Sequence, residues 1–305
     1  MPLFCQTTLL FLVFVLVTPG VRAQQAGPDT QPEVLQVGIQ TGYRSENIRW
    51  SIAGNLQGQD PNIYSELVWK QVNGLLCAAD ARWRAYRSLE VTAHFSMISI
   101  SGGKVTDTDY RGDNRTEPSY SGYFDAGQGS LLSGDLQLGY RLALGKGITL
   151  IPALGYGADR QDLYLKPYEG NAPAGLNSSY VALWKGFLGS ITALFPLGGR
   201  WEVDPSFTYH QVTFDGTADW NLIDDFQHPV SFRDHANGFG LVPALEVLYR
   251  LRRHWSISLH GSYGWWHTGT GVDNLYLSSG QTSLTQYNGA RRSGGEGGLG
   301  FRLGL

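Results

Sequence analysis

The sequence of 305 residues predicts an all-β fold, a closed antiparallel transmembrane β-barrel of about ten strands. Three observations predict it: strand-like segments whose apolar face begins and ends with an aromatic residue, the lack of any late apolar run long enough for a membrane-spanning helix, and a regular alternation of short and long connections. A chain that faces lipid without spanning helices can satisfy its backbone hydrogen bonds only as a closed barrel.

The segment 255–265 shows the first of these features. Side chains alternate between the two faces of a strand, and here one face is apolar and the other polar. Membrane barrels place aromatic girdles at both lipid–water interfaces, and a segment of this length spans roughly 20 Å at a tilt of about 40°. The apolar face carries Trp255, Ile257, Leu259, Tyr263 and Trp265.

The same alternation recurs in segments 89–97, 201–210, 239–250 and 299–305. Charged residues fall on the face that would line the lumen, where a barrel tolerates them. A ten-stranded barrel has a narrow interior, so we expect the inward charges to pair with one another and to block ion flow. These charges are Asp80, Arg82, Glu90, Asp135, Arg141, Glu246 and Arg302.

Four short connections alternate with five long polar ones, which gives ten strands and leaves both chain ends on the side of the short turns. Outer-membrane barrels have short periplasmic turns and long extracellular loops. Twelve strands remain the alternative if one long loop contains a further hairpin. The short connections lie near 85–88, 144–147, 196–200 and 251–254, and the long ones cover about 44–62, 102–129, 158–178, 215–234 and 267–291.

The first residues predict export to a bacterial outer membrane. Residues 1–23 resemble a cleaved secretory signal peptide, with a short apolar run and the small-residue site Val21-Arg22-Ala23, although no basic residue precedes the run. Residues 24–33 are expected to be a disordered lead-in, and residues 34–305 the barrel.

Composition excludes several classes of function. Removal of the signal leaves a net charge of about −4, so nucleic-acid binding is not expected. Cys77 would be the one remaining cysteine, which rules out a disulfide framework and a cysteine metal site. No motif for a cofactor is found, and the inward histidines His94, His210 and His260 favour hydrogen bonding in the lumen over a metal. A soluble β-sandwich is the alternative fold.

The most distinctive cluster of acidic residues is Asp107 and Asp109, in the stretch Gly102-Gly103-Lys104-Val105-Thr106-Asp107-Thr108-Asp109-Tyr110. Residues two apart in an extended segment share a face. Two close carboxylates can share a proton or activate a water molecule. An ordinary acidic surface turn is the alternative interpretation.

Three motifs are considered together: Ser65-Glu66-Leu67-Val68-Trp69-Lys70, the Gly-Gly pair followed by Asp-x-Asp and an aromatic residue, and Gly155-Tyr156 followed by Arg160. They give the chain a resemblance to the omptin family of outer-membrane peptidases. It implies a ten-stranded barrel whose site faces outward, with an aspartate pair opposite an Asp–His pair. The aspartate pair falls on Asp107 and Asp109, and the other aspartate falls on Asp219.

The family's histidine falls on Asn221, which cannot accept a proton from water as histidine can. His228 and His235 follow in the same loop at a different spacing. The stretch from Ala218 to His235 is more similar to a chlamydial-type branch, the Protochlamydia outer-membrane proteins. The resemblance therefore implies weak or absent peptidase activity, which Asn221→His is expected to raise.

The resemblance also implies partners at the membrane surface. Tyr156 and Arg160 match part of the omptin lipopolysaccharide site, so outer-membrane lipid or lipopolysaccharide is an expected partner. Peptides or host surface ligands are the other expected partners. The alternatives left open are an active aspartyl-type endopeptidase and a passive porin or purely structural barrel.

Overall fold

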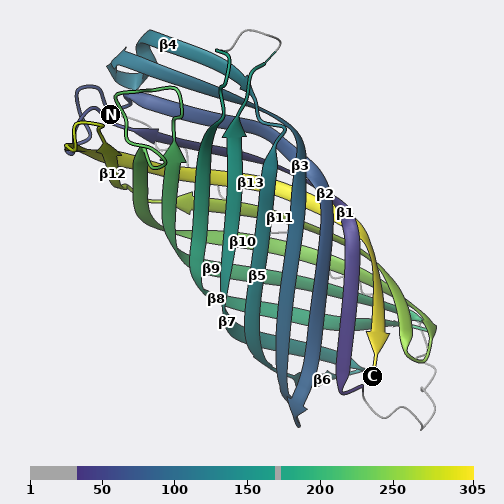
Figure 1. Ribbon diagram of the computed structural model, residues 1–305. Helices are drawn as coiled ribbons and strands as arrows, with labels where there is room; N and C mark the ends of the chain where they lie inside the picture. The colour runs from purple at the N-terminus through teal and green to yellow at the C-terminus, as the bar shows by residue number, and fades with distance from the viewer. Residues whose placement is uncertain (1–32, 169–172) are drawn as a thin grey trace, which may run out of the picture. The chain divides into compact units, whose positions relative to one another are not determined.

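The computed structural model describes residues 33–168 and 173–305. These residues form a single antiparallel sheet that closes on itself as a tall barrel (Figure 1). The all-β fold and the closed barrel predicted from the sequence are confirmed. The signal peptide expected at 1–23 and all but the last residue of the lead-in lie outside the described residues. Within those residues, no helix is long and apolar enough to cross a membrane.

Ten long strands form the ring, because β1 pairs with β13 as well as with β2. In ring order they are β1 (Leu35–Ile52), β2 (Ser65–Tyr86), β3 (Leu89–Gly112), β5 (Gly129–Tyr140), β7 (Ile148–Leu165), β8 (Ser178–Gly198), β9 (Trp201–Asp219), β10 (Phe232–Arg252), β11 (Trp255–Thr268) and β13 (Thr282–Gly304). The predicted count of ten is confirmed. Short additional elements are η1 (Asp113–Arg115), β4 (Thr116–Asp125), β6 (Leu142–Gly145) and β12 (Gly271–Tyr276).

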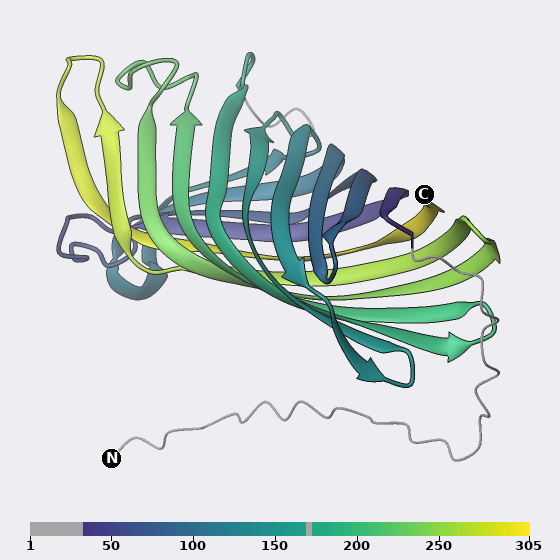
Figure 2. The same cartoon turned by 90° about the horizontal axis from the view of Figure 1, so that it is seen from below.

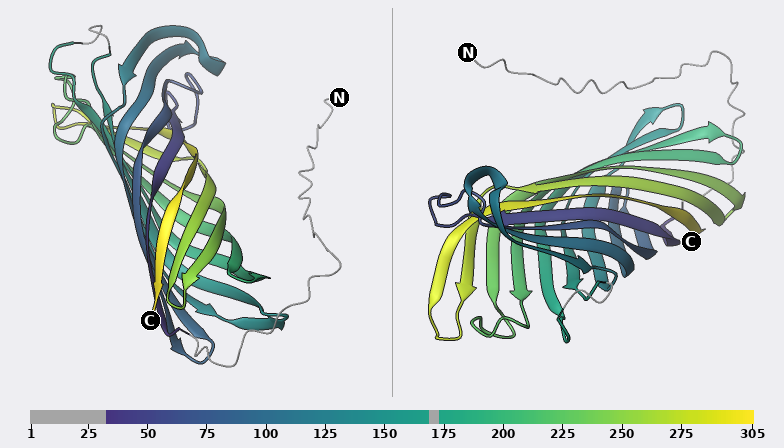
Figure 3. Two further views of the ribbon diagram at one scale, coloured as in Figure 1. Left: turned by 90° about the vertical axis from the view of Figure 1, so that its right-hand side faces the viewer. Right: turned by 90° about the horizontal axis from the view of Figure 1, so that it is seen from above.

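The two ends of the barrel differ as the connection lengths predicted. Asp107 and Asp219 lie near the end that carries β4 and β12, whereas Lys146 and Arg252 lie in the tight turns at the other end (Figures 1 and 2). The end with the long connections is the extracellular one in outer-membrane barrels. The same asymmetry is visible from the side and from above (Figure 3).

Large parts of the predicted long loops are strand, and there the sequence-based expectation is wrong. Segment 102–129, for example, contains the end of β3 and all of β4, which pair with each other. The strands continue well beyond the bilayer, where their outer faces meet water and become polar. A polar outer face removes the alternation by which a lipid-facing strand is recognised, so these extensions resemble loops in the sequence.

A bulge on β3 determines which way the two aspartates point. Phe95 and Met97 face outward and are half exposed, yet Val105 and Asp107, also odd-numbered, are buried inside. The pairing of β2 with β3 shifts between these segments, at Gly102 and Gly103. Gly103 has a φ of +148°, and a Cβ there would lie 3.1 Å from Cα of Val72. The Gly-Gly pair thus turns Asp107 and Asp109 into the barrel.

In the lumen, six of the seven inward charges pair with one another as expected, whereas Asp135 lies against His94 at 3.6 Å. Arg302 contacts Glu246 at 2.8 Å and Asp80 at 3.5 Å. Glu90 contacts Arg141 at 2.6 Å and Arg82 at 3.3 Å. Pairing of this kind offsets the desolvation of charges inside a narrow barrel.

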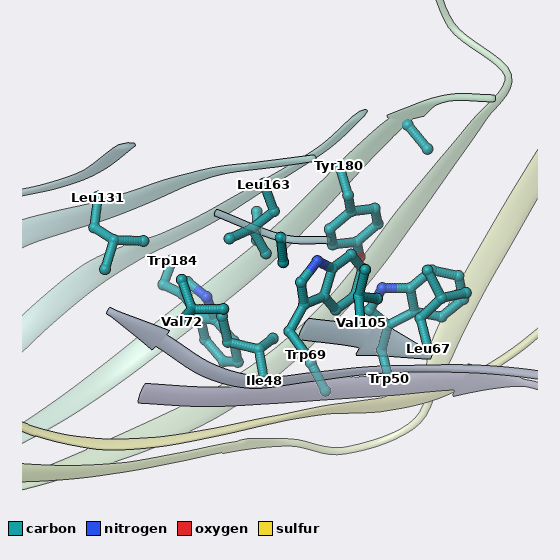
Figure 4. Packing of buried hydrophobic residues seen from close by; sticks show 14 of the residues in the cluster. Ile48, Trp50, Leu67, Trp69, Val72, Val105, Leu131, Leu163, Tyr180 and Trp184 are labelled. Atoms are coloured by element: carbon teal, nitrogen blue, oxygen red, sulfur yellow. The ribbon is translucent and has the colours of Figure 1, made fainter. Parts of the chain in front are cut away.

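An aromatic plug fills the barrel on the extracellular side of these pairs (Figure 4). Trp50 stacks on Tyr180 with ring centroids 5.2 Å apart, and Trp184 packs against Phe214 at 4.6 Å. The sequence did not predict this plug, because its residues come from many strands and are brought together only by closure of the barrel. Its members are Trp50, Trp69, Tyr180, Trp184, Phe214, Phe232, Trp266 and Tyr287.

Candidate acidic site at the extracellular end

A cavity of about 780 Å³ lies beyond the aromatic plug, toward the extracellular end. We call it the acidic cavity. Its wall contains four aspartates from three separate segments and, among the described residues, no lysine, arginine or histidine. Trp50, Tyr120, Trp220 and Phe232 add aromatic surface. The four aspartates are Asp60, Asp107, Asp109 and Asp273.

Asp107 and Asp109 share this cavity, as the Asp-x-Asp spacing predicted. The pKa of Asp107 is raised to about 7, because burial and, to a smaller extent, the negative charge of Asp109 together outweigh a hydrogen bond from Trp220 that opposes the rise. Burial also raises the pKa of Asp109, against a hydrogen bond with Ser65. Asp107 therefore changes its charge near neutral pH, which allows it to exchange a proton or to attract a cation.

A second pair of carboxylates, Asp234 and Asp273, lies beside the first. The two residues are direct cross-strand partners on β10 and β12. The Tyr180 hydroxyl donates a hydrogen bond of 2.7 Å to Asp234, and Thr285 donates one of 3.2 Å to Asp273. Burial raises the pKa of both carboxyls, and the repulsion between them means that the pair retains a proton.

Asp60 and Asp273 had not been identified as site residues from the sequence. Both lie in segments that the sequence assigned to long polar loops, where a single aspartate carries no signal. Asp273 reaches the acidic cavity only because β12 folds back and pairs with β10. The segment 271–276 shows no regular alternation of polar and apolar residues that could have indicated a strand there.

Asp219 is not among the residues that line the acidic cavity. Its neighbours Ala218 and Trp220 are buried on the inner side of β9, so the Asp219 side chain points to the other side. There it contacts His228, with 2.6 Å between Oδ1 and Nδ1. This contact raises the pKa of His228. An Asp–His pair thus exists, but on the face of β9 opposite to the cavity.

Asn221 has hydrogen bonds to the preceding loop. Its side-chain oxygen accepts from the backbone N–H of Asn177 at 2.9 Å and from the Ser178 hydroxyl at 3.2 Å. Its amide nitrogen donates to the carbonyl of Gly175 at 2.9 Å. These contacts give Asn221 a structural function, that of holding the chain between β7 and β8.

Tyr156 and Arg160, the residues expected to bind lipid, both lie on the outer face of β7. Tyr156 is 49% exposed and packs edge-on against Phe187, with centroids 5.5 Å apart. Arg160 is held by Asp162, at 2.7 Å. The arginine charge is therefore already balanced by a neighbouring carboxylate.

Among the described residues, the acidic cavity offers carboxylates and aromatic rings but no histidine that could act as a base. Within residues 33–168 and 173–305, no group of three or more His, Cys, Asp and Glu is arranged to hold a metal ion. Negative charge next to aromatic faces is the chemistry that attracts organic cations such as the side chains of lysine and arginine.

Comparisons with known proteins agree with this fold. The family model described as Pom, Protochlamydia outer membrane protein, matches residues 38–294. The crystal structure of the outer membrane protease OmpT from Escherichia coli superposes with a TM-score of 0.73, at 14% identity, over 91% of this chain and 99% of that chain. At this identity the match supports the fold alone.

Two further solved structures are more distant. The translocator domain of the autotransporter NalP from Neisseria meningitidis has a TM-score of 0.39 at 12% identity, covering 91% of this chain and 90% of that chain. The outer membrane protein OprG from Pseudomonas aeruginosa has a TM-score of 0.37 at 11% identity, covering 90% and 98%. With TM-scores this low, neither structure supports a conclusion about this chain. No curated protein matches its sequence significantly.

Proposed function

Since the chain belongs to the family of Protochlamydia outer membrane proteins, we propose that it is an omptin-like barrel that binds cationic peptide segments in its acidic cavity and has weak or no peptidase activity. The observation that carries the proposal is the composition of the cavity wall, which has four aspartates and no cationic side chain among the described residues. A cationic ligand would supply the missing counter-charge.

The position of the Asp219–His228 pair supports the loss of peptidase activity. In the omptin arrangement an Asp–His pair stands across from the aspartate pair, so that histidine can take a proton from the attacking water. Here the pair lies on the opposite face of β9 from the cavity wall. General-base catalysis is typically worth 10²–10⁴-fold in rate, so its loss leaves little cleavage.

Binding and cleavage of one peptide test the proposal together. The purified barrel in nanodiscs is titrated with the capped peptide Ala-Arg-Arg-Ala, with Ala-Gln-Gln-Ala as the neutral control, and the products are analysed by mass spectrometry. We expect binding of the basic peptide only, with negligible cleavage. Asp107→Asn with Asp109→Asn should weaken binding at least tenfold, whereas Asp225→Asn, an exposed aspartate outside the cavity wall, should not.

Two results would contradict the proposal. Rapid cleavage that Asp107→Asn abolishes would identify an active endopeptidase. Equal affinity for both peptides would mean that the carboxylates do not select the ligand.

The porin alternative is tested by planar-bilayer recording. The paired lumen charges and the aromatic plug both narrow the path through the barrel. We therefore expect little steady current. Stable openings comparable to those of a general porin would favour the pore.

A further inference from the structure

A second charged surface lies outside the barrel, on the strands around its closure. Arg49 on β1 pairs in register with Arg291 on β13, and Arg291 pairs with His267 on β11. All three side chains are exposed and point away from the lumen. Lys70 on β2 lies next to them, and a groove of about 680 Å³ connects the four residues. We call Arg49, Lys70, His267 and Arg291 the basic belt.

The basic belt has no counter-charge among the residues that the structure describes. Within residues 33–168 and 173–305, no carboxylate forms an ion pair with Arg49, Lys70 or Arg291. Like charges directly opposite each other on neighbouring strands are destabilising. Some other outward cations at this end are paired, as Lys185 is with Asp215 at 3.0 Å. Arg233 forms no ion pair with a described residue either, but it lies opposite Thr217 and Asn274 on the neighbouring strands and not opposite another cation. An uncompensated row of cations across adjacent strands fits an external anion.

The position of the belt indicates which anion. Trp265 lines the same groove, two residues before His267 on the same strand. Below it, toward the other end, the outer surface is apolar and exposed, as at Leu259, Leu299 and Ile39. Aromatic girdles mark the boundary between acyl chains and head groups. The belt therefore stands about 7 Å along the strand beyond that boundary, at the level of lipid phosphates.

We propose that the basic belt binds the phosphate groups of an outer-leaflet lipid, whose acyl chains lie against the apolar surface below. Arg49 and Arg291 would hold the phosphate, since guanidinium groups match its oxygens in bidentate geometry. Lys70 adds a point charge, and Trp265 contacts the boundary between the head group and the chains. The same lipid would remove the repulsion between Arg49 and Arg291.

This site differs from the one expected at Tyr156 and Arg160. Those residues lie on β7, several strands away around the ring. Arg160 already forms an ion pair with Asp162, whereas the arginines of the belt are unpaired within the described residues. Lipid phosphate should therefore prefer the basic belt. The chain as a whole has a net charge of −3 at pH 7, so it would not attract phosphate by its overall charge. The attraction must therefore come from the basic belt itself.

Native mass spectrometry of the barrel in detergent, with added lipid A as the probe, tests the proposal. Lipid A that carries its phosphates should bind, and enzymatically dephosphorylated lipid A should bind at least tenfold more weakly. The double variant Arg49→Gln with Arg291→Gln should lose at least tenfold in affinity. Arg49→Lys with Arg291→Lys, which keeps the charge, should lose less. Folding of each variant is checked by its heat-modifiable gel mobility.

Two controls locate the site. Arg252→Gln removes an exposed arginine at the opposite end of the barrel and should leave lipid affinity unchanged. Arg160→Gln should change it less than twofold. Wild-type affinity in the folded Arg49/Arg291 glutamine variant would overturn the proposal. So would equal protection by millimolar inorganic phosphate in a thermal unfolding assay, because the site would then recognise free phosphate and not lipid.

Discussion

The lumen within the bilayer and the cavity outside it use charge in opposite ways. In the lumen, Arg302 lies between Asp80 and Glu246 and forms an ion pair with each of them. In the acidic cavity, Asp107 faces another aspartate, and its pKa rises to about 7. The first arrangement stabilises the barrel. The second is unfavourable for the isolated protein, which is what a site for a cationic ligand requires.

Removal of a lumen charge should have the largest effect on stability. Arg302→Met leaves Asp80 and Glu246 without their cation in a buried position, and breaking a buried pair in this way costs about 3–5 kcal/mol. Urea unfolding in lipid vesicles measures the change. Arg252→Gln, in an exposed turn, should stay within about 0.5 kcal/mol of the wild type. If Arg302→Met also changes the free energy of unfolding by no more than about 0.5 kcal/mol, the ion pairs in the lumen contribute little to stability.

Removal of a cavity charge should have the opposite sign. Asp107→Asn is expected to stabilise the protein by on the order of 1–3 kcal/mol at pH 8, because burial disfavours the charged carboxylate. The folded-state pKa lies above the unfolded one, so the wild type loses stability as the pH rises from about 4 to about 7. The advantage of the variant should therefore grow over that range and stay constant above it. Urea unfolding at pH 4.5 and at pH 8 measures the stability of the wild type and of Asp107→Asn. If the variant is less stable than the wild type at pH 8, the raised pKa of Asp107 is contradicted.

The affinity for a cationic peptide should depend on pH in the range where Asp107 titrates. Below about pH 7 this carboxyl is neutral, and above it the charge is available to the ligand. We expect affinity to rise about tenfold between pH 6 and pH 8, a change of about 1.4 kcal/mol. In Asp107→Asn the rise should be largely absent. A wild-type affinity that is flat over this range would show that Asp107 does not contact the ligand.

The two regions also differ in how well the sequence predicted them. Within the bilayer, lipid forces an apolar outer face, so alternation at Trp255, Ile257 and Leu259 was sufficient to recognise the strand. Outside it, strands such as β12 have no such constraint and were assigned to loops. The Asp-x-Asp spacing did place Asp107 and Asp109 together. The direction in which they point required the bulge at Gly102 and Gly103, which alternation alone does not reveal.

Long-range pairings were equally inaccessible to the sequence. The contact between Asp219 and His228 depends on how the chain folds back after β9, and the partnership of Asp234 with Asp273 depends on the return of β12 to β10. Sequence spacing cannot fix either contact, because each is made by segments whose separation is set by a turn or by tertiary pairing.

The smallest effect is expected from Asn221→His, the substitution that the omptin resemblance identifies as activating. The side chain at this position, in the turn after β9, holds Asn177, Ser178 and Gly175, and it does not line the acidic cavity. An imidazole there would have to leave these contacts before it could take a proton from water between Asp107 and Asp109. We therefore expect no gain in peptide cleavage, but faster hydrogen exchange in segment 175–178, because the histidine cannot make all three bonds. An increase in cleavage of tenfold or more, lost again on Asp107→Asn, would show that this position can reach the cavity and that only the base is missing.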